Sequence, residues 1–355
     1  ANAAGSSPKV RYSAWVGFDI PANVEKVKFS FDGTTARITW PVVTQGVHGG
    51  YVGKVKYDVK RMPDGMQVGT DLDDNKTSMT FSVSGLKKYT FVITPKAGNQ
   101  TGKSTTSNGI VIGEAIQPPF KETFIDEESF ENFTPIDAND DGETWEWGLA
   151  DDFKGRAQSG YNMKGAADDW LLSPPMELRT DRLYNISFDA YNVLASQYTE
   201  VMELAYGMGY NPKTYTKISE PTIVPKEQTK FSYEIRVPQD GSYFFGIHDR
   251  SSYAQWRFYV RNFEVKPGSL LSAPDASTNF NVTVDQTGAE KAALSFTMPT
   301  KTIEGKELKA QLDSAVIYRD NIKLALLSNP ARGAQLSYQD NNVAKGFHIY
   351  KIVVY

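Results

Sequence analysis

The residues from Asp137 to Gly142 have the types and the spacing of a calcium-binding loop. Asp137, Asn139 and Asp141 place an oxygen-bearing side chain at every second position, and Gly142 allows a sharp turn. Calcium prefers a cage of such oxygen ligands. The loop is not an EF-hand, because its twelfth residue is Gly148 instead of a bidentate Glu. Further ligands would be backbone carbonyls, waters or other carboxylates: Glu143, Asp168 and Asp169. A solvated acidic turn has the same composition, so the pattern leaves both interpretations open.

Tryptophans close to this loop could contact a sugar ring or seal a core. Trp145 and Trp147 share one face if the stretch is extended, and they could then form a stacking platform for a sugar. Burial inside a sandwich is the favoured interpretation for this pair. Trp170 opens the apolar run Trp-Leu-Leu, which ends at two prolines, so we assign this side chain to the core.

The segment 248–256 has the composition of a binding loop. Its sequence is His-Asp-Arg-Ser-Ser-Tyr-Ala-Gln-Trp, a polar and aromatic mix that binding surfaces use. The candidate contacts within it are His248, Tyr253 and Trp256. An edge loop without a ligand has the same composition, so this segment too leaves two interpretations open.

Residues for catalysis do not fall into a known pattern. The three histidines, His48, His248 and His348, each fall in a different predicted domain. A Ser-His-Asp hydrolase needs a histidine beside its nucleophile, and the sequence holds no G-x-S-x-G elbow. The acidic run at 124–128 lacks the alternation of jelly-roll glycosidases. The histidine spacing fits no zinc template, and no glycine-rich loop fits a phosphate. We therefore expect a protein that is not an enzyme.

Composition excludes several classes of partner. The 355 residues carry a net charge of −4 with scattered Lys and Arg, so we expect no binding to nucleic acid. The sequence has no cysteine, which excludes disulfides, thiol nucleophiles and thiolate metal sites. No apolar run approaches the roughly 20 residues that span a bilayer, and residues 1–8 lack a signal-peptide pattern. We expect no transmembrane segment here, and any signal or anchor outside these residues.

The apolar residues recur mostly at every second position, which predicts an all-β protein of two or three domains. Residues 21–117 have the strand density of an immunoglobulin-like sandwich. Trp40 ends the second predicted strand and Tyr57 lies in the third, and we expect both side chains between the sheets. This pattern resembles a fibronectin type III domain. Residues 268–355 repeat it, with Met298 at the position of Trp40.

Residues 118–267 differ in sequence pattern from the segments on either side, and prolines mark both ends of this segment. It contains, in order, the acidic loop 137–147, Asp-Asp-Trp-Leu-Leu-Ser-Pro-Pro at 168–175, Leu-Tyr-Asn-Ile-Ser-Phe-Asp at 183–189 and a closing strand at 256–265. In this order the motifs resemble the cleaved-adhesin or choice-of-anchor J jelly-roll family of Bacteroidetes surface proteins, known from gingipain haemagglutinin-adhesin regions. The resemblance implies a jelly-roll sandwich, calcium sites, export to the cell surface and binding of host proteins or glycans. The chain departs from the family at Asn262, where members often carry Asp.

These observations predict two immunoglobulin-like sandwiches flanking a jelly-roll β-sandwich, and a non-catalytic adhesin or interaction protein. Its calcium-stabilised jelly roll would bind a host or matrix protein or a glycan, and the flanking domains would act as spacers. The alternative is an accessory carbohydrate-binding region of a larger secreted protease or glycoside hydrolase. Both hypotheses place the chain outside the cytoplasm, at the cell surface, secreted or periplasmic.

The two ends of the chain resemble two strands of one sandwich edge. A fibronectin-like domain needs a last strand G beside strand F, and the chain stops at Tyr355, just after the predicted strand F at 347–354. Residues 1–20 resemble such a strand G. Residues 9–16 would then pair with 347–354, in cis or from a neighbouring molecule, through Val10, Tyr12 or Trp15. A chain cut from a longer array would explain the same observation.

Overall fold

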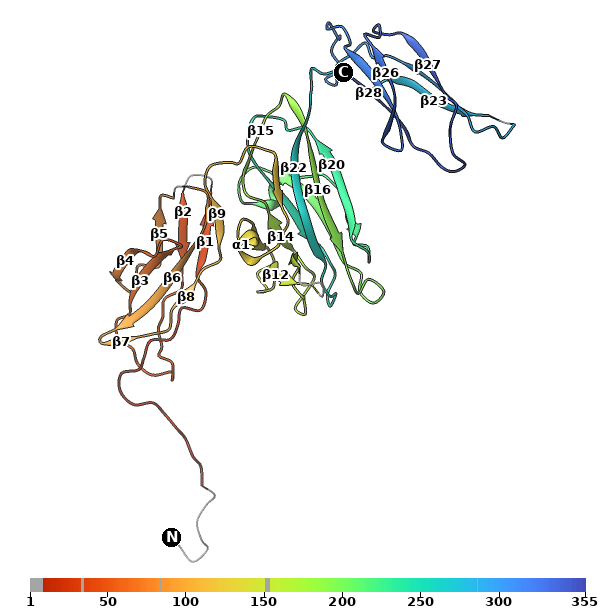
Figure 1. Cartoon of the computed structure of the whole chain (residues 1–355). Coiled ribbons are helices and arrows are strands. Elements are labelled where there is room, and N and C mark those ends of the chain that lie inside the picture. The colour runs from red at the N-terminus through yellow and green to blue at the C-terminus, as the bar shows by residue number, and fades with distance from the viewer. Residues whose placement is uncertain (1–8, 33–34, 84, 151–153, 286) are drawn as a thin grey trace, which may run out of the picture. The chain divides into compact units, whose positions relative to one another are not determined.

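The computed structural model describes residues 9–32, 35–83, 85–150, 154–285 and 287–355 (Figure 1). The predicted all-β class is confirmed, with two immunoglobulin-like sandwiches flanking a jelly roll. The chain falls into two compact units. The first comprises Ala1–Leu178, Ile186–Tyr233 and Asp240–Val265, and the second comprises Arg179–Asn185, Glu234–Gln239 and Lys266–Tyr355. Among the described residues, no helix has the length and apolar character needed to cross a membrane.

The first sandwich consists of two antiparallel sheets. One has the order β1 (Lys28–Phe31), β2 (Ala36–Thr39), β5 (Ser78–Phe81), and the other has the order β4 (Met66–Leu72), β3 (Lys56–Met62), β6 (Lys87–Ala97). Short strands continue the second sheet along β6: β7 (Gln100–Thr101), β8 (Thr105–Thr106) and β9 (Ile110–Ile112). Every second side chain of β6 from Tyr89 to Ala97 is buried. This alternation gives the strand one apolar face, which packs into the core.

Trp40 and Tyr57 lie in this core, as the sequence predicts. Their side chains are 4% and 0% exposed, and the rings meet edge-on with centroids 5.7 Å apart. The hydroxyl of Tyr57 accepts a hydrogen bond of 2.8 Å from the backbone N–H of Val43. Ile38 and Val55 are buried beside them, which confirms the predicted register of these strands.

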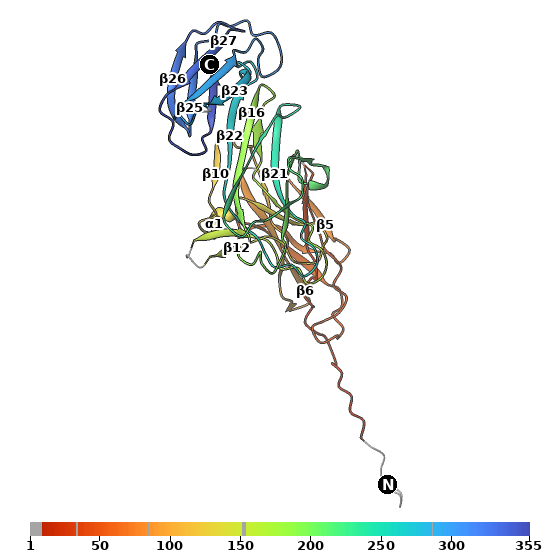
Figure 2. The same ribbon diagram turned by 90° about the vertical axis from the view of Figure 1, so that its right-hand side faces the viewer.

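The jelly roll also has two sheets. One has the order β12 (Glu146–Leu149), β13 (Gly155–Gln158), β22 (Tyr259–Leu270), β16 (Arg182–Tyr191), β20 (Thr229–Ile235), and β10 (Phe120–Glu122) pairs with β22. The other has the order β11 (Thr134–Asp137), β14 (Asp169–Leu172), β21 (Gly241–Asp249), β17 (Val201–Gly207), β18 (Thr216–Lys217). Two further strands pair with this second sheet: β15 (Met176–Leu178) with β21, and β19 (Thr222–Ile223) with β17. Figure 2 shows β16 and β22 side by side.

Both faces of the second jelly-roll sheet are covered. Every residue of β14 is buried, as are the seven residues from Tyr243 to Asp249 of β21. The inner face contributes to a core of phenylalanines that includes Phe133, Phe245 and Phe263. The helix α1 (Glu127–Phe130) adds Phe130 to this region, beside Phe124. On the outer face, the turn η1 (Pro212–Thr214) brings Tyr215 against Trp170, with ring centroids 6.1 Å apart.

The C-terminal sandwich has two three-stranded sheets in the described residues. One has the order β23 (Thr278–Val284), β24 (Ala292–Thr297), β27 (Gln335–Asp340), and the other has the order β26 (Ile322–Ser328), β25 (Ser314–Arg319), β28 (Tyr350–Val354). Met298 is buried in its core, as expected for the position of Trp40. The last strand begins at Tyr350 and not at the predicted position 347, because Phe347 and Ile349 point into solvent.

The predicted strand G lies partly outside the described residues, which begin at residue 9. Residues 9–16 form no strand, and Val10 and Tyr12 are exposed. Trp15 stacks instead on His48, with ring centroids 4.1 Å apart and an angle of 5° between the rings. The prediction that residues 9–16 form a strand within the same chain is therefore wrong. Strand addition to a neighbouring molecule stays a prediction.

Candidate functional site

Three neighbouring strands of the jelly roll position most of the chemically interesting side chains. The register of β14, β21 and β17 places Trp170, His248 and Glu203 in one row. Successive side chains of a strand point to opposite faces of the sheet. Asp169 precedes Trp170 and Asp249 follows His248, so these two carboxylates point inward, while the row of Trp170, His248 and Glu203 lies on the outer face. The sheet thus separates an outer pocket from an inner carboxylate cluster.

The outer pocket has a volume of about 560 Å³. Its apolar lining includes Trp170, Ala205 and Tyr215, and its charged lining comes from strands, loops and the turn η1: Asp168, Glu203, Lys213, Lys217 and Arg250. His248 also lines it. A concave site with an aromatic floor and a few polar groups is the usual form of a small-ligand site.

His248 and Asp168 form a hydrogen-bonded pair at this pocket. His248 Nε2 lies 2.8 Å from Asp168 Oδ1, and the Trp170 indole N–H donates to the same oxygen at 3.3 Å. The His248 ring also stacks on Trp170, with centroids 3.8 Å apart. Burial lowers the pKa of His248 to about 4, and Asp168 opposes this shift only in part. The imidazole is therefore neutral near pH 7, and it orients the Asp168 carboxylate.

This pair does not make a hydrolase site. A Ser-His-Asp mechanism needs a nucleophile in contact with the imidazole. Among the described residues that line the pocket there is no Ser, Thr or Cys. Asp168 is hydrogen-bonded to Nε2 of His248, and Trp170 covers one face of the imidazole ring. This arrangement holds the Asp168 carboxylate in a fixed position and is suited to binding.

Glu203 fixes two cations at the opposite side of the pocket. Its side chain is 2% exposed, and its two oxygens lie 2.7 Å from Lys217 Nζ and 2.6 Å from Arg250 Nη1. Burial opposes ionisation, yet the hydrogen bonds from Lys217 and Arg250 hold the pKa of Glu203 below its ordinary value. The buried carboxylate thus anchors both cationic side chains at the pocket. Sequence reasoning missed Glu203, although a charged residue inside the apolar run Val-Met-Glu-Leu-Ala was a usable signal.

The inner cluster consists of carboxylates on adjacent strands. Asp169 is paired in register with Asp137 on one side and Asp249 on the other. Asp169 is 1% exposed and its Oδ1 has no hydrogen-bond partner. Burial, and next the charges of Asp249 and Asp137, raise the pKa of Asp169 to about 8. These groups therefore resist ionisation together when no cation is near.

Two members of this cluster were not predicted. Burial raises the pKa of Asp249 to about 6, and burial together with the charge of Asp249 raises the pKa of Glu200 to about 7. Glu200 Oε1 also has no partner. In the part of the chain that the structure describes, no Lys or Arg forms an ion pair with Asp169, Asp249 or Glu200. Nothing in the local sequence indicates that these acids meet, because β17 and β21 are brought together only by the fold.

Side chains of the predicted calcium loop form hydrogen bonds to the backbone of the same loop. The Asp137 carboxylate accepts hydrogen bonds from the backbone N–H groups of Asp141 and Gly142, at 3.2 and 2.8 Å. Asn139 Nδ2 donates to Asp141 Oδ2 at 3.0 Å. Glu143 Oε1 faces Lys164 Nζ at 3.8 Å. The loop therefore has the internal hydrogen bonds of an acidic turn.

The structure brings only part of the predicted calcium set together. Asp137 and Asp169 are neighbours and the charge of Asp141 acts on Asp169. Asp168 points to the outer pocket, so its assignment to the same site as Asp169 is wrong; the two side chains lie on opposite faces of the sheet. Among the described residues, no three His, Cys, Asp or Glu side chains converge closely enough to hold a metal ion.

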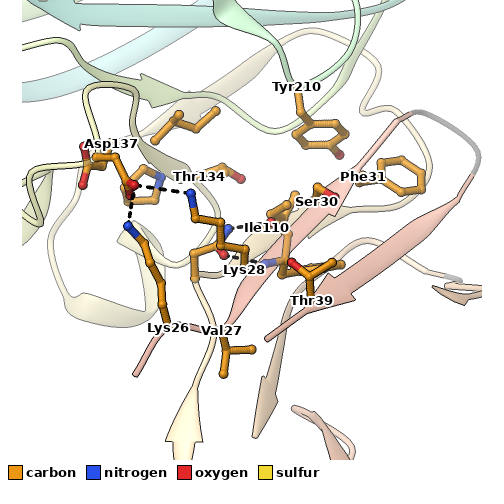
Figure 3. Close-up of a pocket in the computed structure, with 15 residues that line it drawn as sticks. Lys26, Val27, Lys28, Ser30, Phe31, Thr39, Ile110, Thr134, Asp137 and Tyr210 are labelled. Atoms are coloured by element: carbon orange, nitrogen blue, oxygen red, sulfur yellow. Dashed lines mark hydrogen bonds and ion pairs between the residues drawn. The ribbon is translucent and has the colours of Figure 1, made fainter. Parts of the chain in front are cut away.

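Asp140 of this loop contacts the first sandwich, within the same compact unit. Lys26 and Lys28 both pair with its Oδ2, and Figure 3 shows the two lysine side chains converging beside Asp137. A hollow of about 470 Å³ lies here, with Phe31 and Tyr210 lining it farther along. Lys26, Lys28 and Asp140 are engaged with one another here, and Asp137 accepts hydrogen bonds from its own loop.

The predicted aromatic contacts are distributed over separate places. Trp145 is 2% exposed and donates its indole N–H to the Asp169 carbonyl, so the stacking platform with Trp147 is wrong and the core interpretation is right for Trp145. Trp147 is half-buried and donates to the Phe124 carbonyl. Trp256 packs beside Tyr161 and Tyr198, and Tyr253 is exposed. Of the predicted ligand contacts, His248 alone lines the outer pocket within the described residues.

No protein-family model and no curated protein matches the chain. Among solved structures, the K1 cleaved adhesin domain of Lys-gingipain from Porphyromonas gingivalis W83 is similar at 17% identity and a TM-score of 0.36, covering 43% of this chain and 99% of that chain. The CBM22-1 xylan-binding domain from Paenibacillus barcinonensis Xyn10C has 11% identity and a TM-score of 0.32, with coverage of 43% and 97%. The Endo-D glycoside hydrolase domain from Streptococcus pneumoniae R6 has 9% identity and a TM-score of 0.30, with coverage of 67% and 41%. At these low TM-scores, the fold assignment rests on the strand order of the chain itself.

Proposed function

We propose that this chain is a non-catalytic binding protein whose jelly roll holds a glycan in the outer pocket. The observation that carries the proposal is that four of the pocket's five charged side chains are fixed by internal hydrogen bonds and ion pairs before any ligand arrives. Asp168 is held by His248 and Trp170, and the cations of the opposite side are anchored by buried Glu203. Preorganised groups lose little conformational entropy when a ligand binds.

The pocket has the two kinds of group that a sugar needs. Tyr215, which is half-buried and packs on the buried Trp170, supplies an apolar surface for the carbon face of a pyranose ring. The carboxylate of Asp168 accepts hydrogen bonds from sugar hydroxyls, and Arg250 donates to them. The same site serves an adhesin and an accessory carbohydrate-binding region of a larger secreted enzyme, and both place the chain at the cell surface, in the periplasm or in the medium.

We also propose that calcium stabilises the jelly roll beside this site. Asp137 and Asp169 would supply two carboxylate ligands, with backbone carbonyls and waters for the rest, and the buried unpartnered oxygen of Asp169 supports a cation there. The motif order in residues 137–265 further supports membership of the cleaved-adhesin or choice-of-anchor J family, with flanking domains of the fibronectin type III kind. In this proposal calcium has a structural role.

An array of glycans and matrix proteins, probed with the full chain in calcium buffer, tests the glycan proposal. We expect binding to one class of glycan, with at least a roughly tenfold loss in Asp168→Ala. Asp73→Ala, at an exposed turn of the first sandwich, is the matched control and should bind like the parent. Binding to matrix proteins alone, or to no glycan on the array, would overturn the proposal.

A further inference from the structure

We infer that the outer pocket selects saccharides that carry a carboxylate or a sulfate group. This inference rests on the proposed glycan-binding function and adds the chemical class of the sugar. Three cationic side chains, Lys213, Lys217 and Arg250, line the pocket together with two carboxylates, Asp168 and Glu203. The pocket therefore has an excess of one positive charge, although the chain as a whole has a net charge of −4.

Both carboxylates of the pocket are already engaged inside the protein. Asp168 Oδ1 accepts hydrogen bonds from His248 and Trp170, and Glu203 forms ion pairs with Lys217 and Arg250. Glu203 is almost fully buried beneath these cations, while the side chains of Arg250 and Lys217 are 40% and 60% exposed. The cations thus present their outer donors to the solvent side of the pocket, and the negative charge that neutralises them lies on the protein side.

Lys213 adds a cation that has no internal partner. Within the described residues its ammonium group forms no ion pair, and it projects from the turn η1 beside the apolar floor. An ammonium with no carboxylate of its own at a pocket rim is available for a ligand's anionic group. Lys213 therefore distinguishes this pocket from the hollow near Asp140, where both lysines are paired.

The geometry of Arg250 suits an anionic group that offers two or more oxygens. A guanidinium has five donors, and Arg250 Nη1 alone bonds to Glu203 here, so the other donors can engage a carboxylate or sulfate. The ion pair with Glu203 restricts the side chain beforehand, which lowers the entropy cost of that engagement. The sugar ring would then lie over Tyr215, with its anionic group toward Arg250 and Lys213.

Paired probes test this inference. Calorimetric titration of the full chain would use tetrasaccharides of galacturonate, hyaluronan and chondroitin sulfate, each beside a neutral counterpart. The counterpart is carboxyl-reduced for galacturonate and hyaluronan, and both carboxyl-reduced and desulfated for chondroitin sulfate. We expect at least one acidic probe to bind about tenfold tighter than its neutral counterpart at low salt. This ratio should fall as NaCl rises from about 50 mM to about 500 mM, because salt screens exposed charges.

Variants that remove a charge show whether the acidic preference arises in the pocket or from the charge of the protein as a whole. Arg250→Gln combined with Lys213→Gln should abolish the acidic preference, so that the ratio of the affinities for the acidic probe and its neutral counterpart falls to about one. Lys213→Gln alone breaks no internal pair, so it tests the inference even if the double variant is unstable, and we expect about a threefold loss for the acidic probe. Lys323→Gln in the C-terminal sandwich is the matched control and should have no effect.

The outcomes distinguish the inference from the proposal on which it rests. Equal affinity for every acidic probe and its neutral counterpart overturns the inference and leaves the glycan proposal standing. A loss of the acidic preference in Lys323→Gln as well would also overturn it. Equal binding of an oligoglutamate peptide shows that the pocket recognises charge without a sugar and contradicts the saccharide class. Failure of acidic and neutral saccharides alike, together with a negative glycan array, overturns both.

Discussion

Asp168 and His248 are 80 positions apart in the sequence, and the pairing of β14 with β21 brings their side chains within 2.8 Å at the outer pocket. Because burial lowers the pKa of His248 to about 4, the imidazole is a neutral donor near pH 7. His248 therefore holds the Asp168 carboxylate in position, and the two do not act as an acid–base pair near pH 7.

His248 should destabilise the fold as the pH falls. Its folded pKa is about 4, below the ordinary value of 6.5, so the unfolded chain binds the proton first. The stability that the neutral ring provides is complete above pH 6.5 and is lost as the pH falls toward 4. Urea unfolding of the parent and of His248→Gln checks this, and the stability advantage of the parent should shrink over that window. An advantage that stays constant from pH 7 to pH 4 would refute the assignment.

When calcium is removed, the inner carboxylates should make the fold less stable as the pH rises. The pKa values of Asp249, Glu200 and Asp169 are raised to about 6, 7 and 8, so the folded state holds protons that the unfolded chain releases. Stability in chelator is therefore fully present below the ordinary carboxyl pKa and is lost as the pH rises through about 8. Urea midpoints in chelator should fall from pH 5 to pH 8, and less steeply in Asp169→Asn. A midpoint that rises with pH would contradict this account.

Calcium should raise the melting temperature, since an ion that binds only the folded state stabilises it by about 2.7 kcal/mol at a hundred times its dissociation constant. We expect Asp137→Asn and Asp169→Asn to lose the difference between melts in calcium and in chelator. Asp140→Asn, in the same loop, is the matched control, because its carboxylate pairs with Lys26 and Lys28. If the parent melts identically in both buffers, the loop is only an acidic turn.

Trp40→Ala should destabilise the first sandwich by roughly 3 to 5 kcal/mol, because it removes a buried ring that packs edge-on against Tyr57. Trp15→Ala is the control at an exposed tryptophan that stacks on His48, and its cost should be below about 1 kcal/mol. Chemical denaturation followed by circular dichroism measures both. Equal losses for the two variants would mean that Trp40 is not a core residue.

The sandwiches could be predicted because each strand can be recognised from residues that are close together in the sequence. Alternation of apolar residues identifies strands one by one, and the turn residues between them limit their length, so Trp40 and Tyr57 could be assigned to the core. The spacing of Asp137, Asn139 and Asp141 is equally local, and these residues do lie in one turn.

The site could be predicted only in part, because it depends on strand pairing. Asp168 and Asp169 are adjacent in sequence and were both expected to bind calcium, yet a strand sends neighbouring side chains to opposite faces. Asp249 and Glu200 join Asp169 through a register that no local pattern contains. Glu203 and Arg250 meet for the same reason.

The most direct test of the glycan-binding pocket is hydrogen–deuterium exchange of the full chain, with and without the glycan that binds it on the array. We expect slower exchange in peptides that contain 166–170, 203–217 and 246–250, and no change in the C-terminal sandwich at 268–355. Protection confined to either flanking sandwich, or to the hollow between β1 and β11, would contradict it.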